Sequence, residues 1–511
     1  MSIVNMGTDR LALGTGLATV SVAVVALYRL CFHPLAKVPG PFWNAVSRYR
    51  LFHWGFFQDG ITHEKILELH EEYGPIVRIA PNEIHLSDPA DFDLIYKVGS
   101  VFNKDWRFCQ SFGPLHAIFN TVSNTEHRQR RAPLNPFFSR RSVLDQEALV
   151  QEKAAKLCAR VKERLDKGIP ADIHSGFRAV GIDVVTDYAF DDCWDMLDQE
   201  DFGEWFPAMN RTASRGWVFT QHFVVMTPPL WFVLKRAMKH LENVSWFPGV
   251  TIVHRSSKHV EEVVRKIADG DDSKERSIVH QLLAPKESSN GKAPLTPQDL
   301  ADETSVILGA ASETTGTALT IAAYHVIKTP HMYQRLRAEL LEAFPDEDEE
   351  PSFLALEKLP YLTAIIKEAL RMEPGLPGRL QRSAPAGGVL LQGHFIPEGT
   401  TVSMSSHTQH RNSVIFPNPR VFDPTRWMDQ PKDVAQSREN SLVPFSRGTR
   451  QCLGINLAYC ELYVTLGTFF RRFGDLKAPG VIDEDMEFRD FFAAFPAEGA
   501  NLLKVVREAS V

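Results

Sequence analysis

The first hydrophobic segment of the chain differs from every later one. Residues 11–28 read LALGTGLATVSVAVVALY, and none of these side chains is charged. A helix of that length spans roughly 27 Å, close to the thickness of a bilayer core. We therefore expect a transmembrane anchor over residues 11–30, after a short tail at residues 1–10. A cleaved signal peptide is the alternative interpretation.

The charges that flank this segment predict its orientation. Arg10 stands before it, whereas Arg29, Lys37, Arg48 and Arg50 follow it. Positive residues concentrate on the cytoplasmic side of membrane anchors. The body of the protein is therefore expected to face the cytoplasm.

A stiff connection follows the anchor, and short apolar runs then indicate strands. Residues 31–41 read CFHPLAKVPGP, a proline-rich hinge, and we expect one large domain over residues 42–511. Residues 73–80 and 83–86 are apolar runs on either side of Pro81-Asn82, which predicts a hairpin. A second β-rich stretch covers residues 388–404, with glycines at its turns.

Most of the remaining pattern is helical. The apolar spacing at residues 147–165, 260–267 and 360–373 is typical of helices. Thr296-Pro297-Gln298-Asp299 is a helix start, and the pattern then runs to Thr329-Pro330. The polar stretches at 269–276 and 286–294 are expected to be a solvated connection around a short helix. The fold class is therefore mainly α with small β-sheets (α+β).

Composition narrows the function classes. The 511 residues carry a net charge of −7, which argues against nucleic acid as a partner. The six cysteines are scattered and contain no CxxC pair, so neither a disulfide framework nor a zinc site is expected. This pattern is typical of a reducing compartment.

One cysteine stands in a setting of its own. Cys452 lies in the run FSRGTRQCLG, directly before a helical pattern that starts at Ile455. A thiol at the start of a helix is close to unpaired N–H groups and a positive dipole end, which favour thiolate. Gly448 and Gly454 let the backbone approach something large and flat. A buried, inert cysteine is the alternative interpretation.

This run resembles the FxxGxRxCxG heme-ligand signature of the cytochrome P450 family, with Phe445 and Gly454 among its fixed positions. The resemblance extends over residues 38–505, and the hinge wording FHPLAKVPGP is similar to that of microsomal, filamentous-fungal secondary-metabolism members. It implies the P450 fold and heme b (iron protoporphyrin IX), with Cys452 as the axial iron ligand. Axial thiolate favours O–O cleavage.

The centre of the long predicted helix carries the second motif. Residues 309–316 read GAASETTG, which resembles the family's AGx(D/E)T(T/S) pattern, with Ala311 in place of the usual glycine. The resemblance implies O2 binding beside this segment and a proton relay through Thr314 and Glu313, since hydroxyl and carboxylate groups can deliver protons. Close packing against another helix is the alternative interpretation of these small residues.

A third set of residues is expected to support the cysteine loop. Glu368 and Arg371 form an ExxR pair on one helix face, and Arg426 lies in a segment that resembles the family's FxPxRW motif. The resemblance implies a buried network of these three residues. Loss of one would leave an unpaired buried charge and cost heme incorporation.

The remaining cofactor contacts follow from the same resemblance. The cluster HRQRR at residues 127–131 matches the family's WxxxR helix, with His127 replacing tryptophan and Arg131 as a ligand of a heme propionate. Arg450 and Arg379 are further propionate candidates, because the arginine fork binds two carboxylate oxygens. A solvated helix face is the alternative for residues 127–131.

The substrate pocket is the least specified part of the chain. By position, its candidate segments are residues 102–112, 217–232, 308–314, 375–380 and 491–495. The aromatic stretch 217–232 is also expected to touch the bilayer surface.

Together the motifs predict a monooxygenase of the endoplasmic reticulum membrane, single-pass and facing the cytoplasm. The resemblance implies electrons from NADPH through a separate P450 reductase, with cytochrome b5 as a further donor, because no GxGxxG unit follows Cys452. The expected substrate is a lipophilic small molecule such as a terpenoid, polyketide or alkaloid. The alternatives are a heme-thiolate isomerase or dehydratase that needs no O2, and a membrane-tethered heme-binding protein.

Overall fold

A computed structural model describes residues 2–113, 116–190, 192–238, 248–270, 277–283, 295–346 and 349–508. Its helices are α1 Ser2–Leu27, α2 Phe42–Val46, α3 Tyr49–Phe52, α4 Thr62–Tyr73, α5 Pro89–Tyr96, α6 Trp106–Ser111, α7 Asn124–Arg131, α8 Arg140–Asp145, α9 Glu147–Asp166, α10 Ile173–Phe190, α11 Trp205–His222, α12 Thr227–Met238, α13 Pro248–Ala268, α14 Ile278–Leu283, α15 Pro297–Lys328, α16 Pro330–Ala343, α17 Phe353–Leu356, α18 Pro360–Met372, α19 Ser406–His410, α20 Lys432–Ser441 and α21 Ile455–Arg472.

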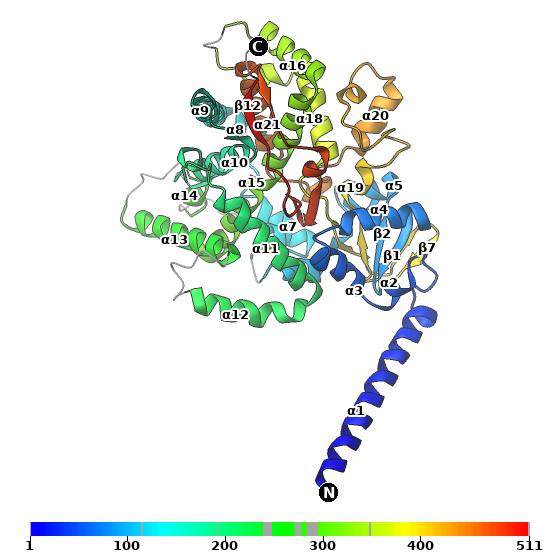
Figure 1. Ribbon diagram of the computed structural model, residues 1–511. Coiled ribbons are helices and arrows are strands. Elements are labelled where there is room, and N and C mark those ends of the chain that lie inside the picture. The colour runs from blue at the N-terminus through cyan, green and yellow to red at the C-terminus, as the bar shows by residue number, and fades with distance from the viewer. Residues whose placement is uncertain are drawn as a thin grey trace.

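The predicted mainly helical fold with small sheets is confirmed (Figure 1). The strands are β1 Ile76–Ala80, β2 Glu83–Leu86, β3 Asn103–Lys104, β4 Ala171–Asp172, β5 Arg382–Ser383, β6 Val389–Leu391, β7 His394–Ile396, β8 Thr401–Ser403, β9 Leu476–Lys477, β10 Phe488–Phe491, β11 Ala493–Pro496 and β12 Lys504–Arg507. The largest sheet has five strands in the order β1-β2-β8-β5-β3. In it β1 and β2 form the predicted hairpin, with Ile76 opposite Leu86.

The long helix α15 is the central helix of the helical part of the protein. It packs against α10, α13, α18 and α21, and most of its side chains are buried. Its start is the predicted cap: the Thr296 hydroxyl accepts a hydrogen bond from the Asp299 N–H, and the Asp299 carboxylate accepts one from the Thr296 N–H. This reciprocal bonding satisfies two N–H groups that a helix start otherwise leaves free.

The polar connections predicted around residues 269–294 lie mostly outside the described residues. The short helix between them is present as α14. The β-rich stretch 388–404 forms the β6–β7 hairpin and strand β8, which joins the main sheet in parallel with β2.

The N-terminal helix α1 projects from the body as a rod (Figure 1). It begins at Ser2 and therefore includes residues 2–10, which we expected to belong to a separate tail. The apolar span from Thr15 to Phe32 has a mean hydropathy of 1.7 and is entirely unburied. It is long enough to cross a membrane.

Candidate active site

The cysteine loop lies between α20 and α21. Cys452 is exposed, and its N–H donates to the carbonyl of Phe445 over 2.9 Å, which closes the loop. The Phe445 ring packs on Tyr459 of α21, at 5.1 Å between ring centroids. A side chain at Gly454 would meet nothing within 4 Å, whereas one at Gly448 would strike the carbonyl of Tyr96. The loop is therefore held by its contacts at Phe445 and Gly448, whereas the side chain of Cys452 is accessible.

The thiol of Cys452 is less acidic than the sequence suggested. The surrounding protein desolvates it and raises its pKa, although the Gly454 N–H and the charge of Arg131 act in the opposite direction. The helix start alone therefore does not make a thiolate here, because desolvation outweighs these groups. A cationic metal is what would deprotonate this sulfur.

Two arginines from the sequence predictions hold this loop. Arg131 of α7 donates to the carbonyl of Gln451 over 2.6 Å. Arg450 donates to the carbonyls of Thr121 and Val122, each over 2.7 Å, on the segment before α7. These hydrogen bonds connect the cysteine loop to α7 and to the segment before it. Arg131 and Arg450 therefore both position Cys452, independently of any cofactor contact.

A cluster of buried cations lies on the other side of Arg450. His127 is buried on α7, and burial followed by the charges of Arg450, Lys104, Arg131 and Arg382 lowers its pKa to about 3. Burial, Arg382 and Arg450 lower the pKa of Lys104 to about 7. Within the described residues, none of Lys104, Arg382 and Arg450 forms an ion pair with a carboxylate. The cluster therefore has an excess of positive charge that a dianionic group would neutralise.

Sequence reasoning missed Lys104 and Arg382 in this cluster and placed Arg379 there instead. Arg379 is not among the charges that act on Lys104 or Arg450. Its guanidinium instead lies 3.1 Å from the carboxylate of Glu83 on β2. The missed signal was the pairing of β3 with β5, which places Lys104 opposite Arg382.

The structure brings Glu368, Arg371 and Arg426 together. Arg371 binds both carboxylate oxygens of Glu368, at 2.8 and 2.9 Å, and Arg426 lies 3.2 Å from the same carboxylate. The Trp427 indole N–H also donates to it over 2.9 Å, a partner that the sequence analysis missed. All three charged side chains are buried, and Glu368 and Arg371 are fully inaccessible.

A buried histidine connects this network to the cysteine loop. Arg371 donates to the carbonyl of His410 over 3.0 Å, and the His410 ring contacts the Arg371 carbonyl in return. The Nε2 atom of His410 accepts the N–H of Val443 over 2.8 Å, so Nδ1 carries the proton. Val443 is two residues before Phe445. The network therefore acts on the loop through His410, which no sequence motif had indicated.

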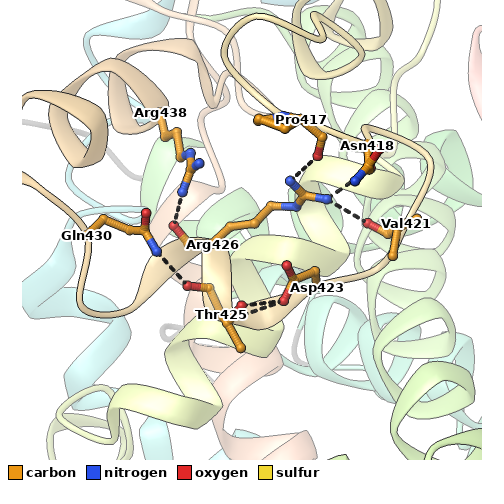
Figure 2. A pocket seen from close by; sticks show the side chains of 8 residues that line it. All are labelled: Pro417, Asn418, Val421, Asp423, Thr425, Arg426, Gln430 and Arg438. Atoms are coloured by element: carbon orange, nitrogen blue, oxygen red, sulfur yellow. Dashed lines mark hydrogen bonds between the residues drawn. The ribbon is translucent and has the colours of Figure 1, made fainter.

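A cavity of about 260 Å³ lies under the segment that Arg426 holds (Figure 2). Figure 2 shows the Arg426 guanidinium pointing at the carbonyls of Pro417 and Val421, and Arg438 bonded to the Arg426 carbonyl. Neither Cys452 nor Thr314 lines this cavity. It is a support region and not the place of chemistry.

The middle of α15 has one open face. Gly309 and Ala310 are exposed within an otherwise largely buried helix, and a side chain at Gly309 would meet nothing within 4 Å. Thr314, one turn further, is partly exposed and donates to the Ala310 carbonyl over 2.9 Å. Helix α15 also packs on α21, the helix that follows Cys452. The protein thus has an open helix face, an open cysteine and a cation cluster without a carboxylate partner among the described residues. These residues fit a flat, dianionic, thiolate-ligated group such as heme.

The opposite face of the same helix packs closely against α10. A side chain at Gly181 would strike the Ala311 carbonyl at 2.9 Å, and one at Gly316 would strike Arg178 at 2.5 Å. Close packing, the alternative interpretation of the GAASETTG run, therefore holds for the face of α15 that contacts α10. On the face of α15 toward α10 the small residues allow close helix packing. On the opposite face they leave open space.

Glu313 points into that packed interface. Its carboxylate lies 2.8 Å from the Nε of Arg178, both side chains are 2% exposed, and its second oxygen has no hydrogen-bond partner. Burial raises the pKa of Glu313, and the charge of Arg178 opposes this rise. The predicted relay thus has its hydroxyl on the open face of α15 and its carboxylate in a buried ion pair.

An aromatic cluster lies on the substrate side. Phe112 stacks on Trp217 of α11 at 4.9 Å, and Phe492 at the β10–β11 turn lies 5.1 Å from Phe112 and 5.4 Å from Phe119. Phe492 has a φ of +81°, an uncommon conformation for a residue with a side chain. Three of the five predicted pocket segments contribute to the cluster, whereas Phe119 lies outside all of them.

Comparison with known proteins decides the family. The cytochrome P450 profile matches residues 42–500. This chain is a member of the cytochrome P450 family. It is 34% identical to the cytochrome P450 monooxygenase MO6277 of Ascocoryne sarcoides, over 97% of this chain and 98% of that protein. It is also 34% identical to the N-acetyltryptophan 6-hydroxylase ivoC of Emericella nidulans, over 94% of each chain, and to the tryptophan 6-hydroxylase fscE of Fusarium equiseti, over 88% and 87%.

The family and its fungal members make this P450 a heme-thiolate monooxygenase of secondary-metabolism type. Members of the family use heme, O2, electrons from a reductase partner and a small-molecule substrate. The isomerase and the non-catalytic alternatives are not favoured by these relatives.

Proposed function

We propose that this P450 inserts oxygen into a lipophilic fungal secondary metabolite, with heme b bound by Cys452 and electrons from NADPH delivered by a separate P450 reductase. Cytochrome b5 is a further electron donor in this proposal. The substrate classes are terpenoid, polyketide and alkaloid. The names of two relatives, which hydroxylate tryptophan and its N-acetyl derivative, add aromatic amino-acid derivatives to them.

The carrying observation is the co-occurrence of an exposed cysteine and an open helix face in a packed core. A heme bound there supplies O2 activation at an iron whose axial thiolate favours O–O cleavage. Cys452 would ligate the iron, and Phe445, Gly448 and Gly454 shape the loop around it. Lys104, His127, Arg382 and Arg450 would bind the propionates, and Arg131 holds the loop backbone.

Thr314 is the residue that we assign to proton delivery. Its hydroxyl is on the open face of α15, and its own hydrogen bond to the Ala310 carbonyl leaves its oxygen free to accept one from water. Glu313 is a positioning residue in this assignment, since its ion pair with Arg178 sets the distance between α15 and α10.

Surface hydrophobicity supports a membrane location. Large apolar side chains are exposed on α2, on the turn before α12 and on α12, among them Trp43, Val225 and Phe232 at 64%, 80% and 68%. Figure 1 shows α2, α3 and α12 on the side of the body from which α1 projects. A bilayer that holds α1 would cover these side chains. We place the protein in the endoplasmic reticulum membrane, with its body in the cytoplasm.

A basic surface beside the cysteine loop supports reductase docking. Arg128 and Arg141 are exposed on α7 and α8, and Gln451 next to Cys452 is exposed as well. Positive charge here would attract an acidic electron donor.

The test is turnover by the full-length, heme-loaded protein with P450 reductase, NADPH and O2, supplied with candidate pathway intermediates. We expect oxygenated products whose formation depends on both NADPH and reductase. Turnover without either of them would establish the isomerase or dehydratase instead.

Thr314→Ala tests the proton assignment. General acid–base groups contribute about 10²- to 10⁴-fold, so we expect product formation to fall at least tenfold while NADPH oxidation continues. Thr304→Ala is the matched control, because Thr304 makes the same hydrogen bond to the preceding turn of α15 but is buried near the helix start. Unchanged product per NADPH in Thr314→Ala would contradict the assignment.

A further inference from the structure

A small cavity lies directly beside the aromatic cluster. It measures about 20 Å³ and is lined by Trp217, His222, Arg379, Asp490 and Phe492, among others. A space of this size holds about one water molecule or one small polar group. Two of the lining residues are therefore rings of the aromatic cluster, and two others, Arg379 and Asp490, are ionisable.

The cation of this cavity is only partly neutralised. The Arg379 side chain is 7% exposed, and its Nε lies 3.1 Å from the Glu83 carboxylate in an ion pair without hydrogen-bond geometry. Its acid, Glu83, also pairs with Arg48 at 2.8 Å and accepts a hydrogen bond from Gln381 over 2.8 Å. Two arginines thus share one carboxylate, which leaves an excess positive charge beside the cavity.

A second ionisable side chain, Asp490, also lines the cavity. Asp490 accepts the N–H of Phe492 over 3.0 Å and forms no ion pair with any described residue. Burial raises the pKa of Asp490 to about 6, so it can take up a proton near neutral pH. His222 is held neutral, because burial and the charges of Arg48 and Arg379 lower its pKa. A buried cation and a buried acid therefore face one space without pairing with each other.

This cavity is within reach of the reaction centre. Gly375 packs on Thr314, since a Cβ added to this glycine would lie 3.1 Å from the Thr314 Cβ, and the chain then runs four residues to Arg379. The Gly375 carbonyl accepts the N–H of Ala494, which fixes the β10–β11 turn and with it Phe492. The cation, the rings and the proton-delivering hydroxyl are thus tied to one another by backbone contacts.

We infer that the substrate is a short aromatic carboxylate, such as an aromatic amino acid or its N-acyl derivative, whose carboxylate binds Arg379 while its ring lies among Phe112, Trp217 and Phe492. The inference rests on the proposed function and narrows its lipophilic class to molecules with a charged head. Asp490 lies beside the substrate carbon that carries the carboxylate and the nitrogen. Its charge state discriminates between a free ammonium and an acylated amide at that nitrogen.

The test is substrate-induced difference spectroscopy of the heme-loaded protein with matched probes. The acids are tryptophan and N-acetyltryptophan, and each is compared with its carboxamide, which has nearly the same size but no charge. Because hydrogen bonds between charged groups are stronger than those of a neutral amide, we expect the acid with the higher affinity to bind about 10- to 100-fold more tightly than its carboxamide. N-acetylcyclohexylalanine, which lacks the aromatic ring, is expected to bind at least several-fold more weakly.

Variants separate recognition from structural support. Arg379→Gln should reduce the acid-to-amide ratio to about threefold or less and leave the affinity of the amide unchanged, whereas Arg379→Lys should retain part of the ratio. Arg48→Gln removes the other arginine of Glu83 and should keep the ratio. A loss of acid and amide binding together in Arg379→Gln would overturn the inference, since it would show a structural role only.

The outcomes distinguish the inference from the proposed function. A heme-loaded protein with the thiolate-type ferrous–CO spectrum that binds neither acid, or binds acid and amide equally, overturns the inference alone. Absence of that spectrum overturns the proposed function. Tighter binding of tryptophan than of its N-acetyl derivative, lost in Asp490→Asn, assigns a free ammonium; the reverse order assigns the N-acyl form.

Discussion

The cysteine loop and the aromatic cavity differ in how many distant segments build them. The loop is one continuous stretch, closed by its own Cys452–Phe445 hydrogen bond and held by Arg131 and Arg450. The cavity takes its walls from α11, from the chain between α18 and β5, and from the β10–β11 turn. In our proposals the first region sets the type of reaction and the second selects the substrate, and variants can disturb the two regions separately.

Cys452→Ser should cause the largest effect. Because a hydroxyl does not replace a thiolate ligand, we expect complete loss of the thiolate-type ferrous–CO spectrum and of turnover. Cys31→Ser, in an exposed position at the end of the anchor, is the control and should change neither. Retained turnover in Cys452→Ser would refute the assignment of the axial ligand.

Arg371→Ala should cause the second-largest effect, because the carboxylate of Glu368 stays buried after its main cationic partner is removed. Breaking a buried ion pair typically costs about 3–5 kcal/mol. We expect a low heme-to-protein ratio and a large fall in the thermal midpoint. Lys367→Ala on the same helix removes an exposed pair with Glu439 and should cost less than about 1 kcal/mol. Equal effects of the two changes would show that the network does not support the loop.

Phe492→Ala should disturb the second region alone. Aromatic pairs contribute about 0.5–1.5 kcal/mol beyond area burial, so substrate affinity should fall roughly tenfold with the ferrous–CO spectrum unchanged. Phe395→Ala, on the exposed face of β7, controls for general loss of a ring. Loss of heme in Phe492→Ala would mean that the two regions are not separable.

Glu303→Gln should give the smallest effect, visible only as a pH dependence. Glu303 is buried on α15 and accepts the N–H of Ile118 over 2.8 Å, next to Phe119 of the cluster. Burial raises its pKa to about 7 from a usual 4.5. Its contribution to folding stability is therefore complete below pH 4.5 and is lost as the pH rises through 7.

Glutamine keeps the acceptor oxygen but does not titrate. The thermal midpoint of the wild type relative to Glu303→Gln should therefore be higher at about pH 5 and lower at about pH 8. A constant difference between these pH values would contradict the raised pKa.

The sequence predicted the elements that local pattern determines. The hairpin of residues 73–86 and the capped helix α15 follow from apolar spacing and cap residues, which are properties of neighbouring residues. The network of Glu368, Arg371 and Arg426 was implied by the resemblance to the family. The N-terminal apolar helix α1 is of the same kind, because its composition alone makes it apolar.

Contacts between distant segments could not be predicted in the same way. Lys104 joins the cation cluster only because β3 pairs with β5, and Arg379 leaves it because Glu83 on β2 holds its guanidinium. Glu313 turns from the open face of α15 because Arg178 on α10 neutralises it. A charged side chain goes to the partner that offsets its desolvation, and that partner is known only when the chain is folded.

The sequence by itself therefore indicated the reaction type, because short motifs around Thr314 and Cys452 resemble those of the cytochrome P450 family. Only the tertiary structure decided which charges meet an anionic cofactor and which are left for the substrate. The physical reason is that burial fixes the cost of each charge, and burial is a property of the packed molecule.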